Sequence, residues 1–129
     1  TVVVNNSPEN GRTGSLKVAL NSIIAELGRL PNSVIMAPID RPGWKSSHVT
    51  QLFQAKNSSC LSQSGNKGHP VNLVKSDLLN IINAPDDIPL RDLVKFDNIE
   101  VVGALLSLNI DAPEDLLELS ENSQFFDEL

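Results

Sequence analysis

Two aspartates stand directly after apolar runs of the sequence, and this placement is typical of metal-binding carboxylates. Asp40 follows residues 33–39 and precedes an Arg-Pro-Gly turn, while Asp111 follows residues 105–110 and precedes Ala-Pro-Glu-Asp. In open α/β sheets, ligands bind beyond the carboxyl ends of the strands. Two carboxylates at such ends could hold one Mg²⁺ ion, which prefers oxygen ligands. Each aspartate also has a purely structural alternative, an Asx-turn for Asp40 and a helix N-cap for Asp111.

A second candidate segment is Gly-Asn-Lys-Gly-His-Pro at residues 65–70. Its glycines allow the backbone to approach a ligand closely. His69 precedes a proline, so it is extended, and it could donate to a ligand or transfer a proton near neutral pH. The structural alternative is a hairpin-like turn with an exposed histidine. His48 falls in a predicted helix with no evident partner and is expected at the surface.

A third candidate is residues 11–16, a glycine-containing loop that leads into a helix at Gly14 and Ser15. Unpaired N–H groups at a helix N-terminus favour anions or carbonyl oxygens. The segment is not a P-loop, because the required Gly-Lys-Ser/Thr ending is missing.

The elements that must position these residues alternate between strands and helices. Helices are predicted from Gly14 to a terminator at Gly28, from Ser46 or Ser47 to about Lys56 with Val49, Leu52 and Phe53 inward, and over residues 76–82, 89–96 and 113–119. Strands are predicted over residues 1–4, 33–39, 60–63, 70–74, 99–103 and 105–110, with a flexible turn at 64–68. The alternation indicates an α/β fold around a largely parallel sheet.

Charge and composition narrow the classes of function. The net charge of −6 argues against general nucleic-acid binding, and no apolar stretch is long enough to span a membrane. The single cysteine, Cys60, fits a reducing, cytoplasmic setting. From Asp111 onward the chain is rich in acids and holds no Lys or Arg, which is typical of a solvated helix and tail.

Four segments, taken in order, resemble the MobA/MocA-like nucleotidyltransferases of molybdenum-cofactor biosynthesis. They are N…G..GSL..AL, IDRP, GNKGHPV and IDAPEDL, and they cover residues 5 to about 117. The resemblance implies a Rossmann-like three-layer sandwich similar to the nucleotide-diphospho-sugar transferases. The chain is expected to lack the first strands of that fold, with residues 1–120 forming the C-terminal two-thirds of one domain and residues 121–129 an acidic tail.

The resemblance also implies an activity and roles for particular residues. The implied reaction moves a nucleoside monophosphate from CTP or GTP to a phosphorylated acceptor, molybdopterin in the best-known members, with release of pyrophosphate. By position, Asp40 and Asp111 match the catalytic, Mg²⁺-binding aspartates. Gly14 and Ser15 match the region that contacts the nucleotide, and the acceptor pocket is matched by Gly68, His69 and Pro70.

Two departures from the family pattern leave alternatives open. The N-terminal glycine-rich loop that binds the triphosphate has no counterpart here, and Ala112 stands where threonine is usual. The portion alone is therefore expected to be inactive. The alternatives are a non-catalytic nucleotide-binding or regulatory relative and a sugar-phosphate nucleotidyltransferase of the same fold.

Overall fold

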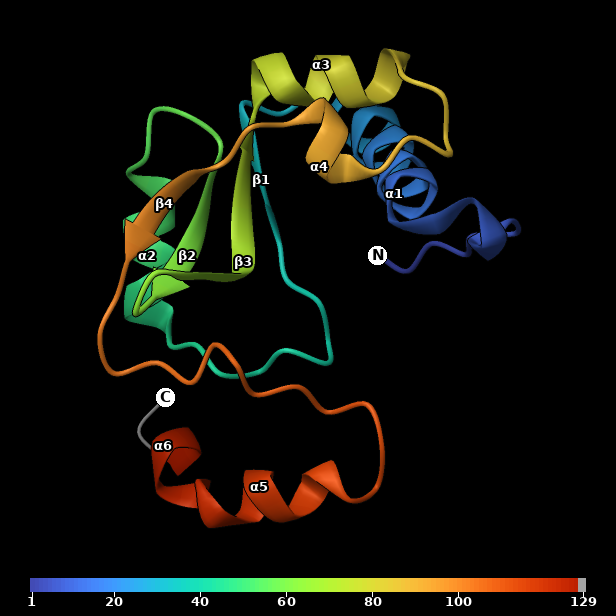
Figure 1. Ribbon diagram of the computed structural model, residues 1–129. Helices are drawn as coiled ribbons and strands as arrows, with labels where there is room; N and C mark the ends of the chain where they lie inside the picture. Colours follow the sequence, from blue (N-terminus) through green and yellow to red (C-terminus); the bar gives the residue numbers. More distant parts are fainter. Residues whose placement is uncertain (128–129) are drawn as a thin grey trace. The chain divides into compact units, whose positions relative to one another are not determined.

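The computed structural model describes residues 1–127 and has a mixed α/β architecture. Figure 1 shows its elements in chain order: η1 (Pro8–Asn10), α1 (Gly11–Leu27), β1 (Ser33–Met36), α2 (Ser46–Phe53), β2 (Ser59–Gln63), β3 (Asn66–Val74), α3 (Lys75–Asn83), α4 (Leu90–Leu93), β4 (Asp97–Glu100), α5 (Asp115–Glu121) and α6 (Ser123–Asp127). The predicted α/β class is confirmed. Within the described part of the chain, no helix has the length and apolar character needed to cross a bilayer.

The four strands form one sheet in the order β1-β3-β2-β4. β2 and β4 are parallel, with Leu61 opposite Ile99, whereas β2 and β3 are antiparallel. The antiparallel pair differs from the expected largely parallel sheet. Its cause is the two-residue turn Ser64-Gly65, in which both residues have positive φ (52° and 79°) and reverse the chain at once. The predicted flexible turn at 64–68 is therefore shorter, because β3 already begins at Asn66.

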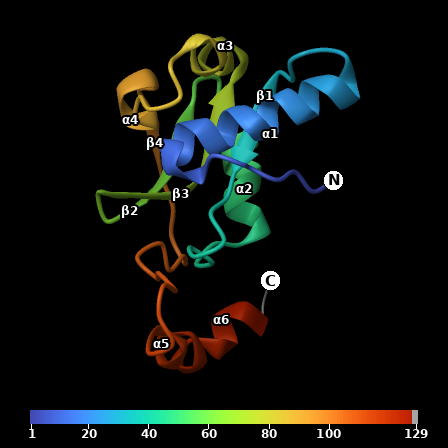
Figure 2. The same cartoon turned by 90° about the vertical axis from the view of Figure 1, so that its right-hand side faces the viewer.

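The chain divides into two compact units, of which the first comprises residues 1–34 and 73–95. In this unit α1 contacts α3, and α3 contacts α4 (Figure 2). Its helices bury leucine and isoleucine side chains, with Leu20, Leu78 and Ile81 fully inaccessible. The predicted terminator is confirmed, since Gly28 adopts a left-handed conformation (φ 73°) and its N–H donates to the carbonyl of Ile24.

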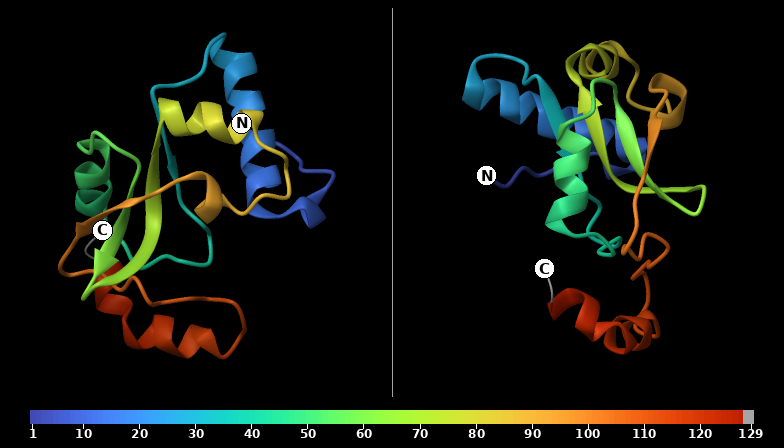
Figure 3. Two further views of the ribbon diagram at one scale, coloured as in Figure 1. Left: turned by 45° about the horizontal axis from the view of Figure 1, so that its top comes forward. Right: turned by 90° about the vertical axis from the view of Figure 1, so that its left-hand side faces the viewer.

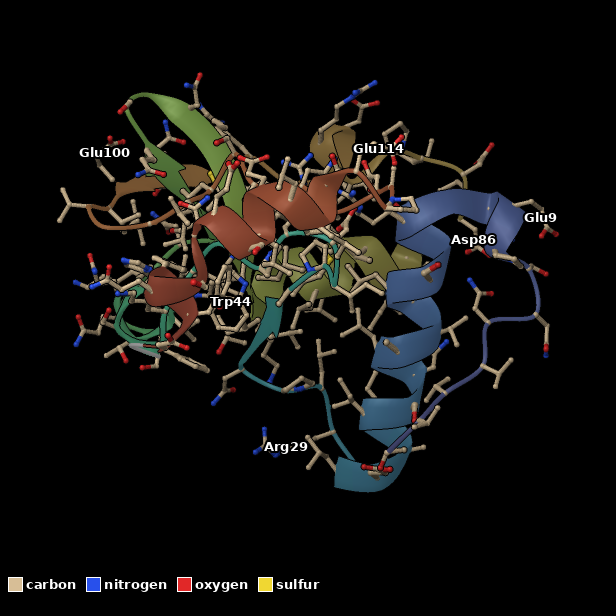
Figure 4. All side chains as sticks on the ribbon, turned by 90° about the horizontal axis from the view of Figure 1, so that it is seen from below. Glu9, Arg29, Trp44, Asp86, Glu100 and Glu114 are labelled. Atoms are coloured by element: carbon tan, nitrogen blue, oxygen red, sulfur yellow. The ribbon has the colours of Figure 1, made fainter. Side chains whose placement is uncertain are left out.

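Polar contacts also tie α1 to the segment between α3 and α4. The Lys17 ammonium lies 2.6 Å from the Asp86 carboxylate and 2.6 Å from the carbonyl of Ala84. Figure 4 labels Asp86 beside α1. The Thr13 hydroxyl donates to the carbonyl of Ile88. These bonds fix the N-terminal half of α1 within its unit.

The second unit comprises residues 35–72 and 96–129. Its core joins α2, β2 and the segment after β4, and Figure 3 shows α2 alongside β2. The buried members of this core are apolar: Leu52, Leu61, Val101, Ala104 and Leu106, with Ile35, Trp44 and Ile99 packed against them. Residues far apart in sequence thus share one core, and this core fixes the positions of the loops next to it, including the segment after β4.

Several predicted elements differ from the structure. Residues 1–4 are not a strand, because no neighbouring strand pairs with them within residues 1–127, and Val2 is 93% exposed. Residues 105–110 form no strand because their backbone groups bond to loops and to a side chain instead. β1 ends at Met36 rather than at residue 39, β4 lies at 97–100 rather than 99–103, and α4 is shorter than the predicted helix 89–96. Phe53, predicted inward, is 61% exposed.

The prediction for His48 is also wrong, because this histidine is buried at the third position of α2. Its Nδ1 accepts the N–H of Lys45, the N-cap residue, at 3.0 Å. Its Nε2 lies 3.0 Å from the carbonyl of Val102. A backbone N–H can only donate and a carbonyl can only accept, so the ring is the neutral Nε2–H tautomer. His48 therefore closes the start of α2 and holds the segment that follows β4.

The predicted acidic tail at residues 121–129 contains the short helix α6 (Figure 3). The Lys45 ammonium lies 4.7 Å from the centre of the Phe125 ring, which connects α6 to the residue before α2. The last two residues of the tail lie outside the described residues.

Candidate functional site

Two loops of the second unit pair backbone to backbone and bring the candidate aspartates to neighbouring segments. One loop follows β1 and the other connects β4 to α5. The N–H of Leu105 donates to the carbonyl of Gly43 at 2.8 Å, and the N–H of Ile110 donates to the carbonyl of Asp40 at 2.8 Å. Since Asp111 follows Ile110, the two predicted metal ligands stand on paired chain segments.

Asp40 lies in a turn, four residues after the last residue of β1. The turn is closed by the N–H of Arg41, which donates to the carbonyl of Pro38 at 3.3 Å. The Asp40 side chain is half-buried, and no group of residues 1–127 donates a hydrogen bond to its carboxylate. The Asx-turn alternative is therefore not formed, and both carboxylate oxygens are available to a ligand.

Asp111 follows an irregular segment rather than a strand, and its side chain is exposed. Its carboxylate accepts a hydrogen bond from the amide of Asn109. The N-cap alternative is not formed, because the N-cap of α5 is Glu114. Instead, Asp115 accepts the N–H groups of Asp111 and Ala112 at 2.9 and 3.0 Å. Asp115 thus shapes the start of the helix and leaves the Asp111 carboxylate outside it.

Asn109 is a further candidate that the sequence motifs did not single out. Its Oδ1 is buried and accepts no hydrogen bond, whereas its Nδ2 donates to Asp111. An amide oxygen without a donor is costly when buried and suits a cation. The sequence offers only a weak signal for this residue, an amide two positions before the candidate aspartate.

A magnesium ion is the cofactor that the resemblance implies, and these donors fit it in chemistry. Two carboxylates and one unpaired amide oxygen are hard oxygen ligands, and Mg²⁺ usually keeps several waters in addition. Within residues 1–127 no cluster of three or more His, Cys, Asp or Glu side chains is arranged to hold a metal. A site here would therefore depend on water and on phosphate oxygens for the rest of its ligands.

The predicted acceptor segment lies in the first half of β3. A side chain at position 68 would be crowded, because a Cβ there would lie 3.0 Å from the Cβ of Leu106. His69 is half-buried, and Pro70 is fully buried. Gly68 thus allows the segment after β4 to pack on β3. Pro70 is buried, so it can influence a ligand only by shaping the backbone of β3.

Gly14 and Ser15 belong to the first unit and lie in the first two turns of α1. The helix begins at Gly11 rather than at the predicted Gly14, and the N–H of Gly11 is already paired, because it donates to the carbonyl of Pro8. The Ser15 hydroxyl accepts from the Asn5 amide at 2.9 Å and donates to the carbonyl of Gly11 at 3.2 Å. Gly14 is buried, and a Cβ there would lie 2.9 Å from Cβ of Asn10.

One carboxylate near the paired loops has a shifted pKa. Glu100, labelled in Figure 4, accepts the Ser62 hydroxyl at 2.6 Å and the N–H of Ser64. The hydrogen bond from Ser62 is the main cause that lowers the pKa of Glu100, the backbone N–H groups of Ser64 and Gly65 lower it further, and desolvation opposes them. Glu100 is therefore a carboxylate that holds the β2–β3 turn.

Comparisons with known protein families, with curated proteins and with solved structures find no match to this chain.

Proposed function

We propose that this chain is part of a magnesium-dependent nucleotidyltransferase. The reaction would move a nucleoside monophosphate from CTP or GTP to a phosphorylated acceptor, with molybdopterin favoured by the resemblance to the MobA/MocA-like family. The observation that carries the proposal is the hydrogen bond from Ile110 to Asp40, which pairs the IDRP and IDAPEDL motifs. The two motifs are separated by 67 residues of sequence, and the backbone hydrogen bond between them does not itself require an aspartate in either motif.

The chemistry consists of one displacement at phosphorus. An oxygen of the acceptor phosphate forms a bond to the α-phosphorus of the triphosphate, and the bond from that phosphorus to the bridging oxygen breaks. Pyrophosphate leaves with the electron pair. Such reactions depend on positioning and on the neutralisation of charge rather than on a covalent nucleophile. The fold class that accompanies this proposal is Rossmann-like, and the proposed setting is the cytoplasm.

Within this proposal the chain supplies oxygen ligands and holds them in place. Asp40 and Asp111 would contribute carboxylate oxygens, and Asn109 its unpaired Oδ1. A bound Mg²⁺ ion would neutralise phosphate charge. The paired loops keep the ligands on neighbouring segments, and Gly14 and Ser15 remain the proposed nucleotide contacts.

The first test measures the affinity of the 129-residue chain for Mg²⁺ by calorimetry. The position of the bound ion is then mapped with Mn²⁺, which broadens the NMR signals of nearby amides. Broadening is expected at residues 40 and 109–112. Asp40→Asn and Asp111→Asn should each weaken binding by at least about tenfold, because one of two carboxylate ligands loses its charge. Asp92→Asn, an exposed acid in α4, serves as the matched control. An unchanged affinity for Mg²⁺ in both Asp40→Asn and Asp111→Asn would contradict the proposed metal site.

The second test is pyrophosphate release by the complete gene product, with CTP or GTP and with or without molybdopterin. Release that requires Mg²⁺ and an acceptor, and that is lost in Asp40→Ala, is the expected result. Binding of a triphosphate without release under any of these conditions would favour a non-catalytic relative. Release with a sugar phosphate in place of molybdopterin would assign the acceptor to that class.

A further inference from the structure

A cavity of about 490 Å³ opens in the second unit beside the paired loops. It is lined by the tip of the β2–β3 hairpin, by residues 104–107 and by Arg41, the residue that follows Asp40. Two of the lining residues are cationic, Arg41 and Lys67, and none is acidic. The lining is therefore cationic, although the chain as a whole carries a net charge of −6.

The two cations of this cavity are not used by the fold. Among residues 1–127, no hydrogen bond or ion pair engages the guanidinium of Arg41 or the ammonium of Lys67. The remaining lining includes the hydroxyls of Ser64 and Ser107 and the amide of Asn66. Cations and neutral hydrogen-bonding groups without a carboxylate are the set that recognises a phosphate group.

The wall of the cavity is held by bonds that leave these groups free to face a ligand. The Gln63 amide donates to the carbonyl of Ala104 at 2.6 Å and accepts the N–H of Leu106 at 3.1 Å. Glu100 binds Ser62 and Ser64 and does not line the cavity. Because the hairpin tip and residues 104–106 are fixed to each other, little ordering is required when a ligand binds.

We propose that this cavity binds the terminal phosphate monoester of the acceptor, with Arg41 and Lys67 as its counter-ions. The guanidinium can engage two phosphate oxygens as a fork, and the ammonium acts as a point charge. Arg41 follows Asp40 directly in the chain, so the cavity adjoins the loop that carries one of the proposed metal ligands. The assignment to the acceptor rests on the proposed function, whereas the binding of phosphate does not.

The test is an NMR titration of the 129-residue chain with inorganic phosphate and with phenyl phosphate, in the absence of Mg²⁺ and nucleotide. Saturable shifts are expected at residues 64–67 and 104–107. Arg41→Gln and Lys67→Gln should each weaken phosphate binding by about tenfold, as expected for loss of one charge-assisted contact. Arg41→Lys, which keeps the charge and loses the fork, should bind with intermediate affinity.

Lys56→Gln is the matched control, since Lys56 is an exposed cation of the same unit that does not line the cavity. Lys67 is itself exposed, so Lys67→Gln provides a readout even if Arg41→Gln fails to fold. Equal affinity of wild type and Lys67→Gln, or shifts confined to other residues, would overturn the proposal. CTP saturating the same amides more tightly than phenyl phosphate would overturn the assignment to the acceptor.

Failure of this inference can be told apart from failure of the proposed function. Phosphate binding at the cavity together with no pyrophosphate release would support the phosphate site and contradict the proposed transferase activity. The opposite outcome is pyrophosphate release, with an unchanged KM for the acceptor, by a complete gene product that carries Arg41→Gln and Lys67→Gln. This result would support the transferase activity and contradict the phosphate site.

Discussion

Gly43 and Leu105 meet backbone to backbone, with the carbonyl of Gly43 accepting the Leu105 N–H at 2.8 Å. A Cβ at position 43 would lie 1.8 Å from the carbonyl oxygen of Leu105. Only a residue without a side chain allows this approach, and the approach pairs the loops that carry Asp40 and Asp111.

The first prediction is that Gly43→Ala lowers the free energy of unfolding by about 2 kcal/mol or more, because backbone atoms cannot rotate away from the added methyl group. Urea denaturation followed by circular dichroism measures the loss. Gly28→Ala is the control, with open space around it and a positive φ of 73°, and should cost only about 1 kcal/mol. Equal losses in the two variants would show that the loops do not pair as described.

The second prediction concerns the buried histidine. Proton-coupled ¹⁵N NMR of His48 should show the Nε2–H tautomer, because Nδ1 accepts from Lys45 and Nε2 donates to Val102. His48→Phe should lower the free energy of unfolding by about 1–3 kcal/mol for each backbone group left unpaired. Ser47→Ala, at an exposed position of the same helix, is the control. An Nδ1–H tautomer would contradict the assignment.

The third prediction follows from the lowered pKa of Glu100. Because the pKa is depressed in the folded state, the carboxylate stabilises the fold above the ordinary glutamate pKa, roughly 4.3, and this contribution is lost as pH falls through the depressed value. The amide signal of Ser64, which donates to Glu100, should report that midpoint.

Glu100→Gln keeps an acceptor oxygen and loses the ionisable proton, so the Ser64 amide of this variant should not respond over the same range. A midpoint in the wild type at or above that of a glutamate in an unstructured peptide would contradict the prediction.

The fourth prediction concerns the thiol of Cys60, which is 2% exposed and donates to the Asn98 side chain at 3.5 Å. Burial raises the pKa of this thiol, and the positive charge of Lys67 opposes the rise. Alkylation by iodoacetamide should be at least about tenfold slower in the folded than in the unfolded chain, because the buried sulfur is hard to reach and its raised pKa lowers the fraction of reactive thiolate. A Ser47→Cys variant that also carries Cys60→Ser should react rapidly.

Local patterns predicted those parts of the fold that local interactions determine. The end of α1 at Gly28 was predictable because glycine tolerates a left-handed conformation. β2 was predictable because a short strand-like segment, residues 60–63, is followed directly by a turn. Residues 1–4 and 105–110 have the composition of strands without being strands. A strand needs a neighbouring strand, and the sequence of a segment does not state what lies beside it.

The candidate site was predictable in part for the same reason. The motifs named Asp40 and Asp111, but the contact between their loops depends on Gly43, whose importance lies in the closeness of Leu105. His48 was expected at the surface because its partner, the carbonyl of Val102, is distant in sequence. A local indication of its role was available, because His48 stands three residues after Lys45, and a side chain at this spacing can bond to the backbone at the start of a helix.

Residues 101–110 contain no helix or strand, yet their backbone is bonded to other parts of the unit at six residues: Val101, Val102, Ala104, Leu105, Leu106 and Ile110. All six bonds use main-chain groups on this segment, which every residue type except proline supplies in full. During divergence this segment should therefore accept substitutions at exposed positions such as Val102 and Ser107, but no insertion or deletion, since a change of one residue in length would shift every later bond away from its partner.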